Sequence, residues 1–352
     1  MSGSGEVRTR IRVLHVSNRM GGGVATAVSS MIANAPSNVD HWMLTSTRPE
    51  HETGVPFTRI ERWGRLPRSN LRQIASIRRA VREIQPDVVW AHSSHSGVVS
   101  RVALAARRER RIIYSPHCFA FERTDTSLAG AYRVAERLLA LNTSVIVACS
   151  RHEERVARAI APSRVRVQYV PNVAPEPPPD SLPKSRISGE RVEIAGLGRL
   201  APQKDPLEFA RVITSLRAAG PVGATWIGDG PTEYRRALTH RGIEVTGWLP
   251  HDKAVVALQQ ADAYLHTAAW EGFPLSVIEA VRFGVPTFVR LIPAFSQVPE
   301  ALIVGKSLQR FVASAPRERA KLAEENLALW NTVLHENTAG AQRAAIEAAL
   351  SW

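Results

Sequence analysis

The sequence has no apolar run that approaches the ~20 residues needed to cross a bilayer, and only two cysteines occur among its 352 residues. The first absence argues against a membrane-spanning helix, and the second against a disulfide framework. The N-terminal segment carries charges where a signal peptide has its apolar core. We therefore expect a cytoplasmic protein in which Cys118 and Cys149 are reduced thiols.

The motifs of several enzyme classes are also absent. Gly196-x-Gly198 lacks the third glycine of a dinucleotide-binding fingerprint, and no Gly-x-x-x-x-Gly-Lys-Ser/Thr phosphate loop occurs. No Asp-x-Asp motif is present to hold a divalent ion on a diphosphate. His92 and His95 have no carboxylate or thiol at ligand spacing, so we interpret them as part of a loop at a strand end. The sequence thus favours neither a dehydrogenase, nor a P-loop enzyme, nor a metal site.

Lysine is missing from residues 1–180, which hold 26 arginines against 15 acidic residues, whereas residues 181–352 hold 19 basic against 17 acidic residues. Most of the net charge of +13 therefore belongs to the first half. Its Arg-rich stretch 59–83, which includes Trp63, is as typical of a solvated helix face as of contact with an anionic membrane surface. Nucleic acid is disfavoured as a partner, because no aromatic stacking platform or binding motif accompanies these arginines.

What the chain does contain is short apolar runs that alternate with helical patterns. In the first half the predicted strands are 11–17, 87–93, 110–117 and 143–150, with a glycine turn at 21–23 and helices over 24–35 and 69–84. In the second half they are 191–200, 223–230, 242–249, 261–268 and 285–291, followed by helices from Pro316 to the end. Near-continuous apolar strands between helices predict parallel sheets covered on both faces.

A proline-rich stretch separates the two alternating patterns. Residues 171–189 hold six prolines, which fix the backbone and remove hydrogen-bond donors. We predict domains at 1–175 and 191–330, a linker at 176–190, and a C-terminal helix at 331–352 that packs back on the N-terminal domain. Open parallel sheets bind ligands beyond the carboxyl ends of their strands, so we expect the chemistry in a cleft between the two domains.

The densest group of chemically capable residues lies at 270–286. Glu271 and Glu279 are separated by seven residues, and between them a Phe-Pro-Leu-Ser segment predicts a loop that enters a short helix closed by Gly284. The amino end of that helix presents N–H groups suited to a phosphate. Each carboxylate is able to accept hydrogen bonds from a sugar diol.

This arrangement of glutamates resembles the signature of the retaining glycosyltransferases of family 4, which have the GT-B fold. Residues 198–205, 228–231 and 247–250 resemble that family's basic phosphate-binding segment, its Gly-Asp-Gly-Pro turn and its base-side loop. In the first half, Gly21–Gly23, Pro86-Asp87 and Pro116-His117 fall where the family has counterparts. Cys118 stands where the family often has glycine.

The resemblance implies a role for each matching residue. Arg199 and Lys204 would hold the donor diphosphate, Glu279 the ribose hydroxyls and Glu271 the donor sugar. His117 would lie beside the transferred sugar.

Backbone groups would complete the donor site. Those of the loop Phe273, Pro274 and Leu275 would add to the phosphate site, with Gly228 and Leu249 close to the nucleotide. Gly22 and Gly23 would let the first loop approach donor and acceptor.

The resemblance implies an α/β protein of the GT-B type, in which two Rossmann-like parallel-sheet domains face each other across a cleft, with the donor on the C-terminal and the acceptor on the N-terminal domain. The expected reaction is metal-independent and retaining. It uses no cofactor beyond a UDP- or GDP-linked sugar as co-substrate. The expected acceptor is a saccharide, most consistently a lipid-linked one used in cell-surface polysaccharide assembly, which would place the protein at the inner face of the plasma membrane. A soluble small-molecule acceptor, a nucleotide-sugar epimerase or phosphorylase, and a non-catalytic nucleotide-sugar-binding relative remain alternatives.

Overall fold

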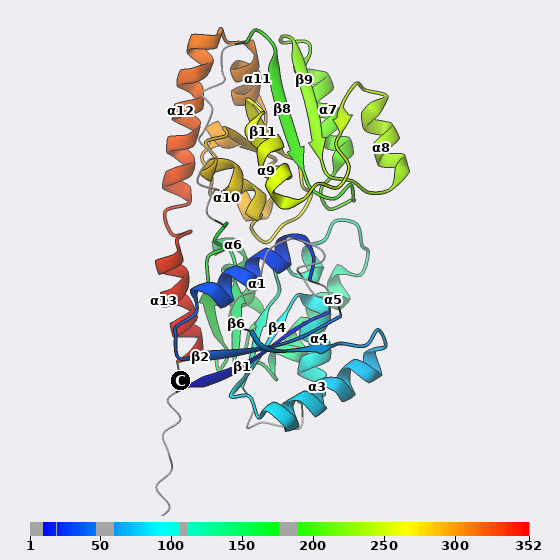
Figure 1. Ribbon diagram of the computed structural model, residues 1–352, viewed down its shortest axis with the longest axis vertical. Helices are drawn as coiled ribbons and strands as arrows, with labels where there is room; N and C mark the ends of the chain where they lie inside the picture. Colours follow the sequence, from blue (N-terminus) through cyan, green and yellow to red (C-terminus); the bar gives the residue numbers. More distant parts are fainter. Residues whose placement is uncertain (1–9, 19, 47–59, 106–110, 176–188, 352) are drawn as a thin grey trace, which may run out of the picture. The chain divides into compact units, whose positions relative to one another are not determined.

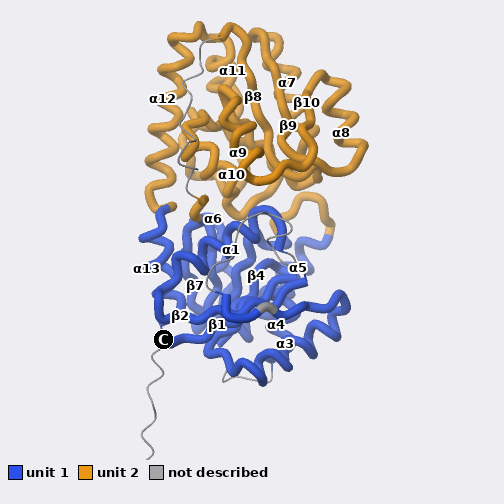
Figure 2. The backbone as a smooth tube through the Cα atoms, viewed as in Figure 1, with its two compact units in different colours: residues 1–121, 128–172, 338–352 blue, residues 122–127, 173–337 orange. Residues whose placement is uncertain are grey.

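The computed structural model describes residues 10–18, 20–46, 60–105, 111–175 and 189–351 (Figure 1). The chain forms two compact units, coloured separately in Figure 2. Unit 1 comprises residues 1–121, 128–172 and 338–352, and unit 2 comprises residues 122–127 and 173–337. Almost all of the predicted linker, at 176–188, lies outside the described residues.

Unit 1 contains a seven-stranded parallel sheet in the order β3-β2-β1-β4-β5-β6-β7. Its strands are β1 (Ile11–Ser17), β2 (Val39–Thr45), β3 (Ile60–Arg65), β4 (Val88–His92), β5 (Arg111–Ser115), β6 (Val145–Ala148) and β7 (Arg166–Tyr169). Four of them fall within the strands predicted from apolar runs. β2, β3 and β7 were not predicted, because polar residues interrupt each of them.

Helices cover both faces of this sheet. They are α1 (Gly22–Asn34), α3 (Asn70–Ile84), α4 (Ser94–Ala103), α5 (Ala129–Ala140), α6 (Arg151–Ile160) and α13 (Ala339–Leu350). On one face, Met31 of α1 and Ile346 of α13 pack with strand residues such as Val13. On the other, Ile77 of α3 and Val99 of α4 pack with Leu14 and its neighbours. This double cover explains why the strands read as continuous apolar runs.

The C-terminal helix α13 belongs to unit 1 and is held there by a buried amide. Gln342 accepts hydrogen bonds from Ser30 Oγ at 3.0 Å and Asn34 Nδ2 at 2.7 Å, and it donates to the carbonyl of Pro171 at 2.8 Å. The predicted single helix over 331–352 is interrupted. A preceding helix ends at Val333, and Thr338 caps a new one by accepting from the N–H of Ala341.

Unit 2 contains a five-stranded parallel sheet in the order β10-β9-β8-β11-β12. The strands are β8 (Val192–Leu197), β9 (Val222–Ile227), β10 (Glu244–Val245), β11 (Ala263–His266) and β12 (Thr287–Val289). The α-helices are α7 (Pro206–Leu216), α8 (Thr232–Thr239), α9 (His251–Gln259), α10 (Leu275–Arg282), α11 (Lys306–Ala313) and α12 (Pro316–Val333). Phe209, Trp226, Phe288 and Phe311 lie in its core.

The edge strand β12 is covered by side chains of α12. Asn326 accepts from the N–H of Thr287 at 2.8 Å and donates to its carbonyl at 3.0 Å. Trp330 Nε1 donates to the same carbonyl at 2.8 Å. A side-chain amide thus makes the two hydrogen bonds that a neighbouring strand would make.

Candidate functional site

Two glycines bring the ends of β8 and β9 together in unit 2. Gly198 and Gly228 follow these strands with φ of +135° and +136°, a region that L side chains rarely adopt. A Cβ on Gly228 would lie 2.2 Å from the carbonyl oxygen of Gly198, which no side chain would tolerate. The two loops that resemble the phosphate-binding segment and the Gly-Asp-Gly-Pro turn therefore meet at the carboxyl edge of the sheet, as predicted for a ligand site.

Lys204 and Glu271 form an ion pair at this edge. Lys204 Nζ lies 2.6 Å from Glu271 Oε1, and both side chains are largely buried. Gln203 Nε2 donates to the other carboxylate oxygen at 3.4 Å. The Lys204 stem runs close beside Gly198. Two residues far apart in sequence, which the family resemblance assigned to diphosphate and sugar, are thus direct neighbours.

The backbone around Lys204 is fixed by its neighbours. Asp205 has a left-handed φ of 47°, and its carboxylate caps α7 by accepting from the N–H of Glu208 at 3.1 Å. Arg290 pairs with the same carboxylate at 2.7 Å. Thr267 Oγ lies within hydrogen-bond distance of the carbonyls of Lys204 and Asp205, at 3.1 and 3.2 Å. Arg290 and Thr267 were not predicted, because their contribution depends on contacts between distant segments.

The second glutamate lies inside α10. Pro274 precedes this helix, and its first turn holds no acidic residue, so its N–H groups face no built-in carboxylate there. Glu279 is 8% exposed, and His251 Nε2 lies 4.0 Å from its Oε1. Burial raises the pKa of Glu279, while the charges of His251 and Lys204 oppose that rise. Leu275 is buried at the helix start, and the Phe273 ring is half-buried beside it.

A buried pair of polar side chains, Tyr264 and His266, lies near Glu271 and was not predicted from the sequence. The Tyr264 hydroxyl donates to Ser276 Oγ at 2.9 Å and lies 2.8 Å from His266 Nδ1. The other ring nitrogen of His266 has no hydrogen-bond partner among the described residues, and it lies 3.9 Å from Glu271 Oε1. Burial lowers the pKa of His266 well below its usual value, so the ring is neutral. The only sequence signal was a histidine at the end of an apolar strand.

Two further residues predicted for the donor site lie on loops of unit 2. Arg199 is exposed directly after Gly198. Leu249 is half-buried in the segment that leads into α9, and its neighbour Trp248 is 65% exposed.

In unit 1, His117 lies in an unusual turn after β5. His117 and Cys118 have φ of 52° and 95°, so two consecutive non-glycine residues adopt the left-handed region. The buried carboxylate of Glu153 holds this turn, because one oxygen accepts from the N–H of Cys118 and the other from that of Cys149, each at 2.7 Å. Ser150 in turn accepts from the N–H of Glu153 at 3.0 Å at the start of α6. This brace lets Cys118 occupy a backbone position where glycine is common.

His117 is also the end of a chain of four histidines. His41 Nδ1 lies 3.0 Å from His15 Nε2, His15 Nδ1 lies 3.0 Å from His92 Nε2, and His92 Nδ1 lies 3.2 Å from His117 Nε2. Trp90 stacks on His15 and on His92. The prediction that His92 and His95 share a loop is only partly right. His92 ends β4, and His95 lies in the first turn of α4.

Gly22 and Gly23 start α1 rather than form a free turn. Gly22 has φ of +56°, and both glycines are exposed. The predicted glycine turn at 21–23 is thus shortened, because Gly21 serves as the N-cap and the helix follows at once.

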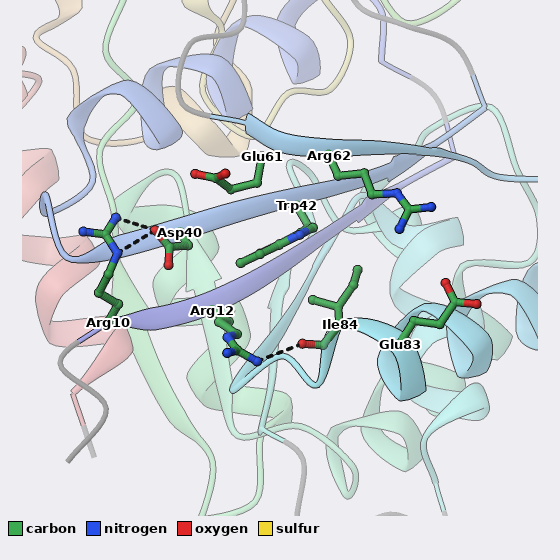
Figure 3. A pocket seen from close by; sticks show the side chains of 8 residues that line it. All are labelled: Arg10, Arg12, Asp40, Trp42, Glu61, Arg62, Glu83 and Ile84. Atoms are coloured by element: carbon green, nitrogen blue, oxygen red, sulfur yellow. Dashed lines mark hydrogen bonds and ion pairs between the residues drawn. The ribbon is translucent and has the colours of Figure 1, made fainter. Parts of the chain in front are cut away.

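A cavity of about 590 Å³ occurs elsewhere in unit 1, where β1 and β2 begin (Figure 3). Its charged lining residues are Arg10, Arg12, Asp40, Glu61, Arg62 and Glu83. Their charges balance, and Figure 3 shows Arg10 paired with Asp40 and Arg12 bound to the carbonyl of Ile84. Because it lies away from the carboxyl ends of the strands, this cavity is not the predicted site.

Neither a metal cluster nor a membrane span emerges from the described ranges. They hold no group of three or more His, Cys, Asp or Glu that is able to bind a metal ion. None of their helices combines the length and apolar character required to span a bilayer.

Comparison with known proteins gives a family match for each half of the chain. Residues 22–173 match the family described as "Glycosyl transferase 4-like domain", and residues 191–331 match "Glycosyl transferases group 1". An "uncharacterized 41.2 kDa protein in cps region" of Klebsiella pneumoniae is 24% identical over 302 residues, which is 82% of this chain and 83% of that protein. The Escherichia coli UDP-Gal:alpha-D-GlcNAc-diphosphoundecaprenol alpha-1,3-galactosyltransferase is 23% identical over 241 residues, 62% of each chain.

A solved structure gives the same fold. The Anabaena Alr3699/HepE complex with UDP and glucose superimposes with a TM-score of 0.74 at 16% identity, covering 97% of this chain and 99% of that one. Two parallel-sheet units, the two family matches and this likeness agree. The chain belongs to the family 4-like glycosyltransferases of the GT-B fold.

Proposed function

We propose that this glycosyltransferase moves a sugar, with retention of configuration and without a metal ion, from a UDP- or GDP-sugar to a hydroxyl of a lipid-linked saccharide. Unit 2 binds the donor, and His117 of unit 1 contacts the transferred sugar. The proposal depends chiefly on one observation, the Lys204–Glu271 ion pair at the glycine-lined carboxyl edge of the unit 2 sheet.

The donor fits this edge by charge and by hydrogen bonding. Lys204 and Arg199 supply positive charge for the diphosphate, and the amino end of α10 adds N–H groups. Glu279 accepts from the ribose hydroxyls and Glu271 from the sugar. When the diphosphate binds, Lys204 gains a stronger anionic partner, which leaves the Glu271 carboxylate available to the sugar.

The proposed reaction needs no protein base. The bond between the anomeric carbon and the diphosphate oxygen breaks as the acceptor oxygen bonds to that carbon from the same face. The acceptor proton passes to the departing phosphate oxygen. Lys204 and Arg199 stabilise the negative charge that develops on the diphosphate, which is the role of preorganised cations in such steps.

The acceptor class is inferred from the two relatives. One lies in a cps region, and the other transfers galactose to a diphosphoundecaprenol-linked sugar. A lipid-linked acceptor requires access to a membrane surface, and the surface chemistry of unit 1 supports this. On α5, Val134 and Leu138 are 57% and 63% exposed, although apolar residues one turn apart normally face a core. Arg133 and Arg137 beside them are exposed too.

We therefore propose that the anionic membrane contact lies on α5. The Arg-rich α3 packs on α4, which in turn packs on α5. The Arg-rich stretch 59–83 includes Arg62, Arg65 and Arg68, which are exposed at β3 and just before α3. The side chain of Trp63 is outside the described set. Each basic side chain near an anionic surface contributes about 1 kcal/mol.

Vesicle sedimentation separates these contributions. Val134→Ser with Leu138→Ser should abolish binding to vesicles of phosphatidylglycerol and phosphatidylcholine at low salt. Replacing Arg62, Arg65 and Arg68 by glutamine should weaken it by about 3 kcal/mol if all three lie near the surface. Equal recovery of the wild type from anionic and neutral vesicles would reject the membrane contact, and a soluble acceptor would then be favoured.

The test of the reaction has two steps. Thermal shifts with UDP-, GDP-, dTDP- and ADP-sugars identify the donor, because a ligand that binds only the folded state raises Tm. The selected donor is then incubated with a polyprenyl-diphosphate-linked saccharide, and the anomeric coupling of the product is read by NMR. An α-linked product from an α-linked donor, formed equally well with and without EDTA, supports the proposal, and a β-linked product overturns retention.

The same assay distinguishes the alternatives. Conversion of the nucleotide-sugar without any acceptor would indicate an epimerase. A thermal shift without turnover on any acceptor would indicate a non-catalytic binding protein. A phosphorylase would require a lysine for pyridoxal phosphate, and lysine is scarce in this chain.

A further inference from the structure

Three of the four hydrogen-bonded histidines of unit 1 have no part in the proposed reaction, yet their line ends at His117, a residue of the proposed site. Its members come from four separate segments. His41 lies on β2, His15 on β1, His92 at the end of β4, and His117 in the braced turn after β5. The sheet order β2-β1-β4-β5 places these segments side by side. The four hydrogen-bonded histidines therefore form a line that crosses these four strands.

The rings lie nearly in one plane. Successive rings are inclined by 28°, 17° and 26°, and their facing nitrogens are 3.0 to 3.2 Å apart. Three of the four rings are buried with at most 2% exposure, whereas His117 is half-buried. These are hydrogen-bond distances, so each contact needs one nitrogen with a proton and one without.

The rings of His15, His92 and His117 are neutral near pH 7. Burial lowers the pKa of His15 and His92 well below the usual value and that of His117 to about 4. A neutral imidazole has one donor and one acceptor nitrogen. If His92 donates from Nε2 to His15, its bare Nδ1 must accept from His117. If it accepts at Nε2, its Nδ1–H must donate to His117.

The hydrogen bonds thus leave only two self-consistent states. In one, the rings of His15, His92 and His117 carry their protons on Nε2, so His117 has a bare Nδ1. In the other, they carry them on Nδ1, and His117 has an Nδ1–H. Among the described residues only Nε2 of His117 is hydrogen-bonded, so Nδ1 is the nitrogen left for a ligand.

We propose that His41, His15 and His92 are positioning residues that couple the tautomer of His117 to their own and fix its ring orientation, so that its Nδ1 offers the transferred sugar the hydrogen-bond role set by the whole line. This inference rests on the proposed contact of His117 with the sugar. It assigns a purpose to three buried polar side chains at positions where apolar residues would pack at lower desolvation cost. The stacking of Trp90 on His15 and His92 holds the rings in line.

Nitrogen NMR of the histidine-labelled protein tests the coupling directly. Long-range correlations distinguish Nδ1–H from Nε2–H rings, and single replacements assign the 11 histidines. In the wild type, His15, His92 and His117 should share one tautomer. In His15→Phe, which keeps a ring beside Trp90 but removes both nitrogens, His117 should become a mixture of tautomers. Replacement of the exposed His240 by asparagine serves as the control and should leave the nitrogen signals of His15, His92 and His117 unchanged.

A matched pair at His92 separates positioning from packing. In His92→Asn the amide replaces Nδ1 and is able to bond His117, whereas in His92→Gln it replaces Nε2 and reaches His15 instead. We expect kcat/KM to fall about tenfold in His92→Gln, the equivalent of one buried hydrogen bond, and to recover in part in His92→Asn. Should His15→Phe not fold, the His117 signal in His92→Asn gives the same tautomer readout.

Different tautomers at His15, His92 and His117 in the wild type would overturn the inference. So would a single unchanged His117 tautomer in folded His15→Phe. These results do not depend on activity. If the tautomers are coupled but His117→Asn transfers sugar at the wild-type rate, the proposed contact of His117 fails instead.

Discussion

Units 1 and 2 have the same parallel-sheet architecture but arrange polar groups at their strand ends differently. In unit 2 the groups are charged and paired, as in Lys204 with Glu271 and Arg290 with Asp205. In unit 1 a line of hydrogen-bonded imidazoles runs from His41 and His15, inside the sheet, to His92 at the end of β4 and His117 after β5. A charged edge suits a diphosphate whose charge grows as it leaves, whereas a neutral edge suits hydroxyl groups that need a defined donor or acceptor. The same fold thus supports two kinds of recognition.

The largest expected effect tests the charged side of this comparison. Lys204→Ala or Arg199→Ala should lower turnover about a hundredfold or more, which corresponds to about 2.7–4 kcal/mol of lost electrostatic stabilisation. Steady-state kinetics with the identified donor measures it. Lys321→Ala, an exposed lysine of α12, is the matched control and should leave turnover unchanged. Unchanged kinetics in both site variants would remove these residues from the donor site.

Acid should lower the stability of unit 1 more than that of unit 2. The folded-state pKa values of His15, His92 and His117 lie below the unfolded value near 6.5, so the unfolded chain binds more protons. Above pH 6.5 these histidines are neutral in both states, and their contribution to the free energy of unfolding is fully present. That contribution is lost as the pH falls toward about 4, the folded pKa of His117. Each contributes on the order of 1 kcal/mol per pH unit in that window.

The stability of unit 2 should change less over the same pH range. It has one comparable histidine, His266, whose pKa is lowered by burial. The pKa of Glu279 is raised, so its burial penalty is relieved as the pH falls. Hydrogen exchange at pH 7 and pH 5 should therefore show β1 and β4 losing protection before β8 and β11. Loss of protection in β8 and β11 before β1 and β4 would contradict this expectation. Replacing His92 by asparagine should reduce the acid sensitivity of unit 1.

A smaller effect tests the buried, hydrogen-bonded imidazole of His266 in unit 2. Tyr264→Phe removes a buried hydroxyl that contacts both Ser276 and His266, so the free energy of unfolding of unit 2 should fall by about 1–3 kcal/mol. Urea unfolding measures the change, with the half-buried Tyr234→Phe as control. An effect no larger than that of the control would mean that this group contributes nothing to the sheet edge.

The smallest expected effect is that of a chelator. We expect EDTA to leave activity intact, because we propose that Lys204 and Arg199 neutralise the diphosphate charge in place of a divalent ion. Activity that is lost in EDTA and restored by Mg²⁺ or Mn²⁺ would assign part of that role to a metal.

Part of the charged edge was predictable from sequence, because Lys204, Glu271 and Glu279 lie in segments with recognisable spacing, whereas Arg290 was not. Glu271 and Glu279 belong to one loop and helix, and Lys204 follows a glycine-bearing strand end. The histidine line was not predictable, because His15, His41 and His92 occupy single positions in separate strands. A lone histidine in an apolar strand gives no sign of its partner until the strand order is known, and β2 itself was not predicted. The brace on Cys118 by Glu153 was hidden for the same reason.

The amide of Asn326 on the edge strand β12 also bears on how copies of this protein behave toward one another. An edge strand presents unpaired N–H and C=O groups that another chain is able to use as a template for sheet extension. Asn326 and Trp330 occupy both groups of Thr287 with side chains of the same chain. The sheet is therefore closed at this position to strand addition, which protects unit 2 against edge-to-edge aggregation as the protein becomes concentrated.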